Sequence, residues 1–278
     1  MHLVSILRLT CNGGRQIFNH SRLCEPSKLY SRRFFSDHAK SANITHVIFD
    51  FDGVLLDTES IFYQTNKQCL QRFGVPYNKE LKQGQMGRKL EEGVHWLLAQ
   101  TGLDEKGVTA ESYISLYNSI LHNLFENPRE MPGAKRLVDH LHKHEVNVAI
   151  CTGSASGEYR LKTRKCQDLV EKIPLVVLAG DDPEVEHGKP SPDPYLVTMK
   201  RFDVRPPHPK NVLVFEDSVN GALSGIAAGC TTIMIPQDEF KPANWDEVCK
   251  KLKPDLAEIL NSLSDFEPEK YGLPPFDQ

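Results

Sequence analysis

The chain has 278 residues, 40% hydrophobic and 8% aromatic, which is ordinary for a globular enzyme of one large or two modest domains. No apolar run approaches the length that spans a bilayer, so we expect no membrane partner. The formal net charge is −4, and because residues 1–40 contain seven Lys or Arg and two Asp or Glu, the rest carries −9. This acidity argues against a nucleic acid partner and is compatible with a small phosphorylated metabolite. We expect a monomer.

The first forty residues have the composition of a targeting segment. Several Arg and Ser residues are accompanied by only two acids, Glu25 and Asp37. This pattern is typical of a mitochondrial transit peptide, and the segment R-F-F-S at residues 33–36 resembles a processing site with cleavage before Ser36. The alternative is a disordered extension without a targeting role, which would leave the protein cytoplasmic.

Seven cysteines are scattered along the chain without any C-x-x-C pair. This usage indicates reduced thiols in an intracellular protein and argues against a disulfide framework or a structural zinc site. Cys151 stands beside a hydroxyl residue, but we interpret it as a small buried strand residue and not as a nucleophile.

The first predicted strand ends in two acids. The segment V-I-F-D-F-D-G begins at Val47 and places Asp50 and Asp52 two residues apart. Side chains at i and i+2 of a strand share a face, so both carboxylates start out in the same direction. Two buried acids are costly unless a positive group lies beside them. A metal ion, a phosphoryl group or both would provide the compensating interaction.

A helical block follows this strand. Asp57 or Thr58 can cap a helix that continues to Phe73 and is ended by a Gly-Val-Pro turn. Two more helical patterns cover 91–98, closed by a glycine, and 111–125, followed by a Met-Pro-Gly break. We therefore assign 59–130 to a helical domain inserted after the first strand.

The remaining chain alternates helices with apolar strands. Such alternation predicts a doubly wound parallel sheet covered by helices on both faces, so the fold class is α/β. We assign 41–58 and 131–278 to this core. The strands are predicted at 146–152, 175–179, 212–215 and 231–235, and the helices at 137–142, 194–202 and 221–228.

Polar groups follow the strand ends of this core. Thr152, Gly153 and Ser154 follow one strand, and Glu216 and Asp217 follow another. Lys189 lies in a proline-rich loop, H-G-K-P-S-P-D-P. Because open α/β sheets bind ligands at the carboxyl ends of their strands, we expect these groups to meet the Asp pair at one edge.

This ordered set of motifs resembles the haloacid dehalogenase superfamily of phosphotransferases, from about Thr45 to near the end of the chain. The segments G-D-D-P-E-V-E-H-G-K-P-S-P-D, V-L-V-F-E-D and S-L-S-D-F-E-P-E-K-Y-G-L-P-P look like those of the pseudouridine 5'-phosphatases within it. The resemblance implies a Rossmann-like core, a helical cap over the active site, and Mg²⁺ as the cofactor.

Phosphoryl transfer needs a nucleophile, charge neutralisation and a proton for the leaving oxygen. Asp50 is the candidate nucleophile and forms an aspartyl-phosphate. Asp52 is the candidate general acid and base, which requires a pKa raised relative to that of Asp50. By resemblance, Mg²⁺ would be held by the Asp50 side chain, the Asp52 backbone carbonyl and the acid pair. We favour Asp217 as a direct ligand, with Glu216 as a ligand or a support for one.

The phosphate is expected to contact the groups after the second strand. Thr152 would donate to a phosphate oxygen, assisted by the backbone amides of Gly153 and Ser154. Lys189 would neutralise charge on Asp50 and on the phosphate.

Substrate choice is expected to depend on the cap. Residues 86–89, M-G-R-K, match a specificity loop of the family, in which Gly87 permits close backbone approach and Arg88 reaches a ligand oxygen. An ordinary solvated loop between helices is the alternative.

The sequence therefore predicts a Mg²⁺-dependent phosphatase of a small monoester. By resemblance, the substrate is pseudouridine 5'-phosphate. The alternatives are glycerol 3-phosphate or a sugar phosphate, then a phosphomutase, and, in a different class, a phosphate-binding scaffold without catalysis.

Overall fold

The computed structural model describes residues 43–85, 90–125, 129–238, 241 and 244–277. Among the helices of the described ranges, none has the length and apolar character needed to cross a bilayer.

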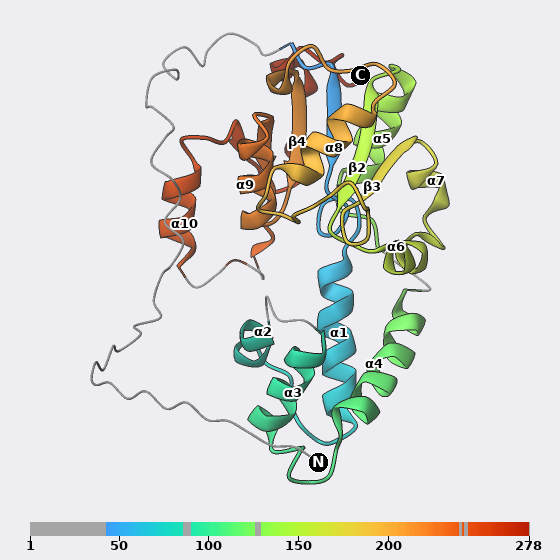
Figure 1. Cartoon of the computed structure of the whole chain (residues 1–278), viewed down its shortest axis with the longest axis vertical. Coiled ribbons are helices and arrows are strands. Elements are labelled where there is room, and N and C mark those ends of the chain that lie inside the picture. The colour runs from blue at the N-terminus through green and yellow to red at the C-terminus, as the bar shows by residue number, and fades with distance from the viewer. Residues whose placement is uncertain (1–42, 86–89, 126–128, 239–240, 242–243, 278) are drawn as a thin grey trace, which may run out of the picture. The chain divides into compact units, whose positions relative to one another are not determined.

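The centre of the described fold is a six-stranded sheet in the order β3-β2-β1-β4-β5-β6 (Figure 1). Every neighbouring pair of these strands is parallel. β1 lies between β2 and β4, and Phe49 at its end aligns with Ile150 and Phe215. The tips of three strands distant in sequence therefore meet at one edge. The strands are β1 His46–Phe49, β2 Asn147–Thr152, β3 Leu175–Leu178, β4 Val212–Glu216, β5 Thr231–Met234 and β6 Glu258–Ile259.

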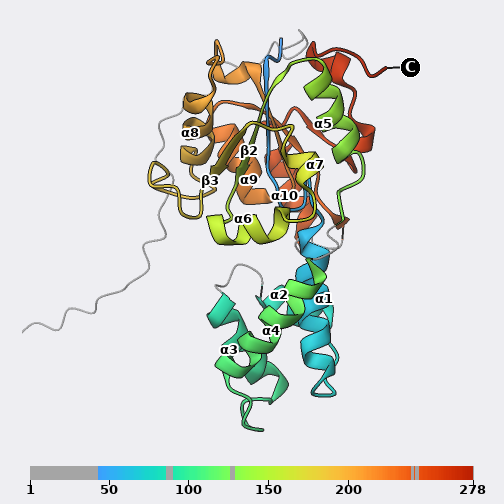
Figure 2. The ribbon, with the colours of Figure 1, turned by 90° about the vertical axis from the view of Figure 1, so that its right-hand side faces the viewer.

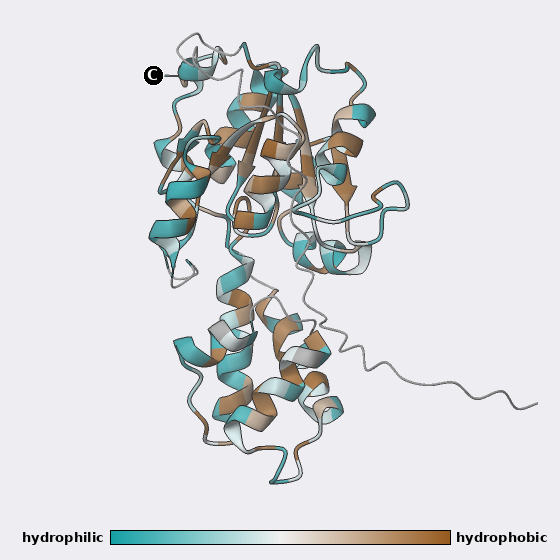
Figure 3. Ribbon diagram, turned by 60° about the vertical axis from the view of Figure 1, so that its left-hand side comes forward, coloured by the Kyte–Doolittle hydropathy of each residue, from teal (hydrophilic) through white to brown (hydrophobic). Residues whose placement is uncertain are grey.

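Helices cover both faces of the sheet, with α5 on one side and α8 on the other (Figure 2). In β1, Phe49 packs in the cluster that contains Leu137 of α5, whereas Ile48 packs with Tyr195 of α8. The strands are apolar on both faces because both faces are buried, as Figure 3 shows by their colour. The core helices are α5 Ala134–Lys143, α6 Ser156–Thr163, α7 Gln167–Val170, α8 Asp193–Arg201, α9 Val219–Ala227 and α10 Trp245–Leu252, with the short 3-10 turn η1 Pro209–Asn211.

A helical insert, residues 58–124, separates β1 from the rest of the core. Asp57 caps its first helix by accepting a hydrogen bond from the Ser60 amide at 3.1 Å. The insert has its own apolar cluster, in which Leu97 and Tyr113 are fully buried. The chain returns to the core where Glu130 bridges to Leu56. The helices are α1 Thr58–Gln71, α2 Lys79–Gln85, α3 Leu90–Thr101 and α4 Ala110–Leu124.

The C-terminal tail forms two 3-10 turns, η3 Leu263–Asp265 and η4 Pro268–Tyr271, and packs on the sheet domain. The ring of Phe266 meets that of Phe215, in β4, edge to face at 4.9 Å between centroids. Gly133 lies so close to the tail that a Cβ there would be 2.4 Å from the Ser264 backbone nitrogen. The tail is therefore part of the apolar core.

Candidate active site

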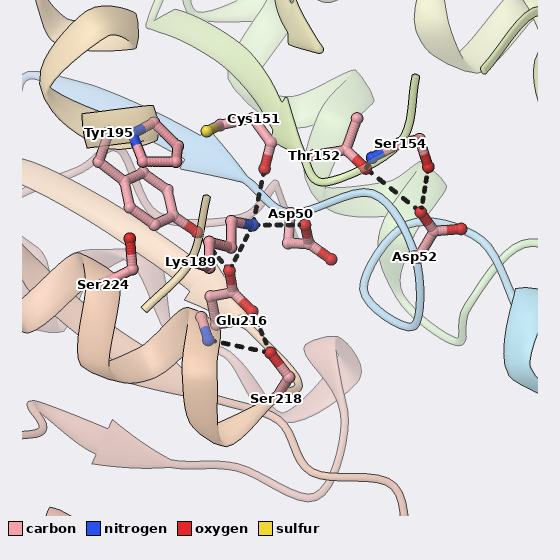
Figure 4. A network of polar contacts seen from close by, with 12 residues as sticks. Asp50, Asp52, Cys151, Thr152, Ser154, Lys189, Tyr195, Glu216, Ser218 and Ser224 are labelled. Carbon is pink, nitrogen blue, oxygen red and sulfur yellow. Dashed lines mark hydrogen bonds and ion pairs between the residues drawn. The ribbon is translucent and has the colours of Figure 1, made fainter. Parts of the chain in front are cut away.

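Three strand tips and one loop bring the predicted polar groups together (Figure 4). Lys189 reaches from its loop between Asp50, just after β1, and Glu216, the last residue of β4. Its Nζ lies 2.7 Å from Asp50 Oδ1, 2.6 Å from Glu216 Oε1 and 2.9 Å from the Cys151 carbonyl oxygen. Tyr195 donates its hydroxyl to the same Glu216 oxygen. We call Lys189, Asp50, Glu216 and Tyr195 the Lys189 cluster.

The electrostatics of the Lys189 cluster are dominated by burial. The side chains of Asp50 and Glu216 are 9% and 1% exposed. Burial, only partly offset by Lys189, together with the charges of Glu216 and Asp52, raises the pKa of Asp50 to about 7. Although burial alone would lower it, the pKa of Lys189 is raised well above its usual range by Asp50 and Glu216. Lys189 therefore stays protonated and positively charged.

Asp217 completes a group of acids suited to a hard cation. Carboxylate oxygens of Asp50, Glu216 and Asp217 lie within 4.8 Å of one another. Burial and the charges of its acidic neighbours raise the pKa of Asp217 well above its usual range, so the negative charge here exceeds what Lys189 balances. Clustered carboxylate oxygens of this kind fit Mg²⁺. The part proposed for the Asp52 carbonyl stays a prediction.

Glycines make room for this acid group. Gly53 has a φ of +76°, and a Cβ there would be 1.9 Å from Asp217 Oδ2. A Cβ on Gly221 would be 1.9 Å from the Glu216 carboxylate. Ser218, and not Asp217, caps α9 by accepting a hydrogen bond from the Gly221 amide at 3.0 Å. Asp217 is therefore not required as a helix cap.

Asp52 belongs to a second group, which we call the Lys162 cluster: Lys162, Asp52, Thr152 and Ser154. The hydroxyls of Ser154 and Thr152 contact Asp52 Oδ2 at 2.9 and 3.2 Å, as Figure 4 shows. Lys162, in α6, lies 2.7 Å from Asp52 Oδ1 and donates to the Ser154 hydroxyl at 2.7 Å. Both oxygens of Asp52 are therefore contacted from the core.

The structure differs from two expectations about these groups. The Thr152 hydroxyl, expected on phosphate, contacts Asp52, and the Ser154 amide donates to Thr152 Oγ1 at 3.1 Å. The pKa of Asp52 is lowered despite its burial, chiefly because the Lys162 ammonium lies beside it, whereas that of Asp50 is raised. The protein groups thus order the two pKa values opposite to our prediction. A divalent cation beside Asp50 would lower the pKa of Asp50.

The remaining predicted residues have varied surroundings. Gly153 is open, since a Cβ there would meet nothing within 4 Å, which leaves its backbone accessible to a ligand. Gly87 and Arg88 lie outside the described residues. Cys151 is fully buried, and burial raises the pKa of its thiol to about 11, so the thiol is unsuited to nucleophilic chemistry.

A cavity of about 970 Å³ lies between the strand tips and the helical insert. On the core side it reaches Asp217, and on the insert side it reaches Glu59, which pairs with Lys82 at 3.5 Å. Its wall carries five aromatic side chains and several amide side chains. The aromatic members are Phe62, Tyr63, Tyr77, Tyr117 and Trp245.

Sequence reasoning missed Lys162, Tyr195 and the aromatic wall. Lys162 follows no charge pattern in its helix, and only the folded chain brings it to Asp52. Tyr195 reads as an apolar residue of a sheet-facing helix, and its contact with Glu216 depends on the packing of α8. The aromatic residues of the predicted helices were the sequence signal for this wall. They were equally compatible with the buried face of a packed helix.

Comparisons with known proteins identify the family of this chain. Residues 47–235 match the model of the family described as haloacid dehalogenase-like hydrolase. The chain is 38% identical over 239 residues to (DL)-glycerol-3-phosphatase 2 of Arabidopsis thaliana, covering 86% of this chain and 95% of the relative.

It is 34% identical over 233 residues to a Drosophila melanogaster protein named "Probable pseudouridine-5'-phosphatase", covering 84% of this chain and 96% of the relative. Among solved structures, a HAD family hydrolase of Deinococcus radiodurans with bound phosphate and sodium matches with a TM-score of 0.69 and 25% identity, over 84% of this chain and 99% of that one.

Proposed function

Since the chain belongs to the haloacid dehalogenase-like hydrolases and is a phosphatase of small phosphate esters, we propose that its preferred substrate is pseudouridine 5'-phosphate. The observation that carries this choice is the aromatic-walled cavity of about 970 Å³ beside Asp217. Aromatic side chains stack on bases, and such a volume suits a nucleoside better than a three-carbon alcohol.

A second candidate is glycerol 3-phosphate. The observation that favours it is the relative named as a glycerol-3-phosphatase, whose identity to this chain is 38% against 34% for the relative named after pseudouridine. Both substrates require the same transfer chemistry, so the difference between them lies in the cavity and not at the strand tips.

In the proposed mechanism, an oxygen of the Asp50 carboxylate attacks phosphorus and the bond to the ester oxygen breaks. Asp52 gives a proton to that oxygen, and the alcohol leaves while Asp50 carries the phosphoryl group. Asp52 then takes a proton from water, the water oxygen attacks phosphorus, and inorganic phosphate leaves with Asp50 restored. Lys189 keeps a positive charge 2.7 Å from Asp50 throughout.

We propose that Asp50, Asp217 and Glu216 hold Mg²⁺, which fits their crowded oxygens. When bound, the cation offsets the negative charge of Asp50 and of the phosphate. We further propose that the helical insert acts as a cap and that Gly87 and Arg88 help to read the substrate.

The test is phosphate release by the full chain, with and without Mg²⁺, from pseudouridine 5'-phosphate, uridine 5'-phosphate, glycerol 3-phosphate and a sugar phosphate. We expect kcat/KM for pseudouridine 5'-phosphate to lead by at least tenfold, about 1.4 kcal/mol of transition-state discrimination. Replacing Trp245 by Ala should remove most of that lead and leave glycerol 3-phosphate hydrolysis within about threefold. If glycerol 3-phosphate leads, the second candidate holds. The Asp50→Asn variant, which lacks the nucleophile, measures the background rate of phosphate release.

We also propose that residues 1–40 direct the protein to mitochondria. Their basic, Ser-containing composition supports this proposal. A fluorescent protein fused behind residues 1–40 should enter mitochondria, and the matched fusion with its arginines changed to Gln should not. A diffuse cytosolic signal from the first fusion would contradict the proposal.

A further inference from the structure

We propose that Lys162 is a positioning residue for the acid–base step, and that Phe62 of the helical insert helps to hold it in place. This inference rests on the proposed function, in which Asp52 exchanges protons with the leaving oxygen and with water. It adds a residue that no motif of the sequence indicated, and it gives the insert a direct contact with the machinery of proton transfer.

The first observation is the number of donors around Asp52. Lys162 Nζ lies 2.7 Å from Oδ1, and the hydroxyls of Ser154 and Thr152 lie 2.9 and 3.2 Å from Oδ2. Lys162 also donates to the Ser154 hydroxyl at 2.7 Å, so it orients one of those hydroxyls as well. With both oxygens contacted, rotation of the carboxylate about its χ angles is restricted.

The second observation is the burial of Lys162. Its side chain is only 5% exposed, whereas that of Asp52 is 25% exposed. A lysine of a short surface helix would ordinarily extend into water, and burial of its ammonium is compensated here by Asp52 and Ser154. The buried lysine thus supports the carboxylate, while a quarter of the Asp52 side chain remains exposed.

The third observation links this lysine to the insert. Lys162 Nζ lies 5.5 Å from the centroid of the Phe62 ring, which belongs to α1. Phe62 also lines the cavity, and its ring meets that of Phe125 at 6.1 Å. A cation over an aromatic face is attracted to it, so Phe62 helps to restrain the Lys162 ammonium. Phe62 therefore contacts both the cavity and Lys162, the residue that we propose positions Asp52.

The fourth observation is the contrast with Lys189, which contacts Asp50 and Glu216. Lys189 touches the nucleophile and Glu216, which is one of the proposed metal ligands, whereas the Lys162 ammonium contacts Asp52 and Ser154. Loss of Lys162 should consequently affect proton transfer and leave attack by Asp50 largely intact.

Leaving groups separate these two steps. p-Nitrophenolate leaves without a proton, whereas an alkyl oxygen needs one. In quench-flow experiments on the full chain with Mg²⁺ and p-nitrophenyl phosphate, the first burst of p-nitrophenolate should be released by Lys162→Met at a rate within about threefold of that of the unchanged protein. Steady-state kcat for pseudouridine 5'-phosphate and for glycerol 3-phosphate should fall about 100-fold, with KM changed by less than about threefold. Asp52→Asn should show the same pattern with a larger loss.

Two further variants and a control complete the test. Lys162→Arg, which keeps the charge, should recover at least tenfold of the lost kcat. Phe62→Leu should show a weaker form of the pattern, about three- to tenfold on the alkyl esters and little on the burst. Lys165→Met removes an exposed lysine nearby and should change neither rate. If Lys162→Met does not fold, the Arg and Phe62 variants decide.

The proposal is overturned if Lys162→Met or Phe62→Leu slows the burst as much as the alkyl esters, or if the Arg variant recovers nothing. A failure of the proposed function gives a different result. In that case Asp50→Asn retains turnover, or Asp52→Asn hydrolyses alkyl esters at the rate of the unchanged protein.

Discussion

The Lys189 cluster and the Lys162 cluster each combine a lysine, an aspartate and a hydroxyl, but their aspartates differ in exposure and in the direction of the pKa shift. Each holds a largely buried lysine against an aspartate that follows β1, and each involves a hydroxyl from a neighbouring element. In the Lys189 cluster the aspartate side chain is 9% exposed, whereas in the Lys162 cluster it is 25% exposed. The pKa of Asp50 is raised and that of Asp52 is lowered.

The difference shows how two acids separated by one residue acquire separate tasks. Asp50 shares Lys189 with Glu216, so one lysine serves two carboxylates, and the proposed Mg²⁺ would balance the remaining negative charge. The Asp52 carboxylate has Lys162 as its cation. The first cluster is therefore built for charge neutralisation at phosphorus, and the second for placing a single carboxyl group.

The largest expected effect comes from removing the charge of each aspartate in turn. Asp50→Asn should lower kcat by about 10⁴-fold or more, because no nucleophile remains, while the free energy of unfolding changes little. Asp52→Asn should lower kcat for alkyl esters about 10²- to 10⁴-fold and destabilise the fold by about 2 kcal/mol, because Lys162 loses its counter-charge. Rapid-quench kinetics and urea unfolding measure both. Equal stability losses in the two variants would remove the distinction between the clusters.

Removing Lys189 should break the first cluster only. Lys189→Met leaves two buried carboxylates facing each other, and we expect a loss of about 3–5 kcal/mol at pH 8 along with nearly all activity. The loss should be smaller at pH 5, where protonation of Asp50 relieves the repulsion. Lys200→Met, at an exposed ion pair with Glu184, is the matched control and should cost less than about 1 kcal/mol. A pH-independent loss would argue against like-charge repulsion.

The two clusters should respond to pH with opposite signs. The raised pKa of Asp50 favours the folded state while the group is protonated, so this contribution is present below about pH 4 and is lost as the pH rises through about 7. The lowered pKa of Asp52 contributes stability above about pH 4 that is lost as the pH falls through its folded value.

Addition of Mg²⁺ sharpens this contrast. At pH 8, Mg²⁺ at about 100 times its Kd should add about 2.7 kcal/mol of stability, and it should add less at pH 5.5, where protons compete for the carboxylates. Thermal unfolding with and without Mg²⁺ at both pH values measures the effect. Asp217→Asn should reduce the Mg²⁺-dependent increase, whereas Lys162→Met should leave it intact.

A smaller effect is expected from crowding the acid group. Gly221→Ala places a Cβ 1.9 Å from the Glu216 carboxylate, which should displace that side chain, cost about 1–3 kcal/mol and weaken Mg²⁺ binding. Calorimetric titration with Mg²⁺ measures the affinity. Gly157→Ala is the control, since a Cβ there meets nothing within 4 Å. An unchanged Mg²⁺ affinity in Gly221→Ala would show that Glu216 does not support the metal.

The smallest effect is expected from the Cys151 side chain. Its carbonyl oxygen accepts from Lys189 at 2.9 Å, but its thiol is buried and its pKa is raised to about 11. Cys151→Ala should keep kcat within about threefold and cost about 1 kcal/mol. A thousandfold loss of kcat in a folded variant would contradict a purely structural thiol.

Much of this fold could be predicted from local sequence, because buried parallel strands are short apolar runs with clear ends. The runs that became β1, β2, β4 and β5 were identified within one or two residues. β6 and α7 were missed because they are only two and four residues long, and α2 and α6 were missed because polar residues interrupt their apolar faces. α10 was also missed, although its apolar residues at 245, 248, 249 and 252 follow the helical spacing.

Residues of the candidate site could be predicted only where one short segment of the chain contains the whole motif. Asp50 with Asp52, and Glu216 with Asp217, are neighbours in the chain and could be recognised as pairs. The contact of Lys162 with Asp52 joins two distant segments and depends on the placement of α6, so no local pattern records it. The predicted order of the two pKa values was wrong because this contact lowers the pKa of Asp52, while burial raises that of Asp50.

The position of β1 in the sheet has a consequence for how the protein is made. β1 leaves the ribosome first among the strands, yet its partners are β2 and β4, and β4 ends at Glu216. At about 5–20 residues per second, β1 waits roughly ten to thirty seconds for its second neighbour. The helical insert, with its own apolar cluster, emerges during this interval. During synthesis, β1, whose four residues are all buried in the folded protein, must therefore be shielded until β4 emerges, and chaperone dependence should be set by β1.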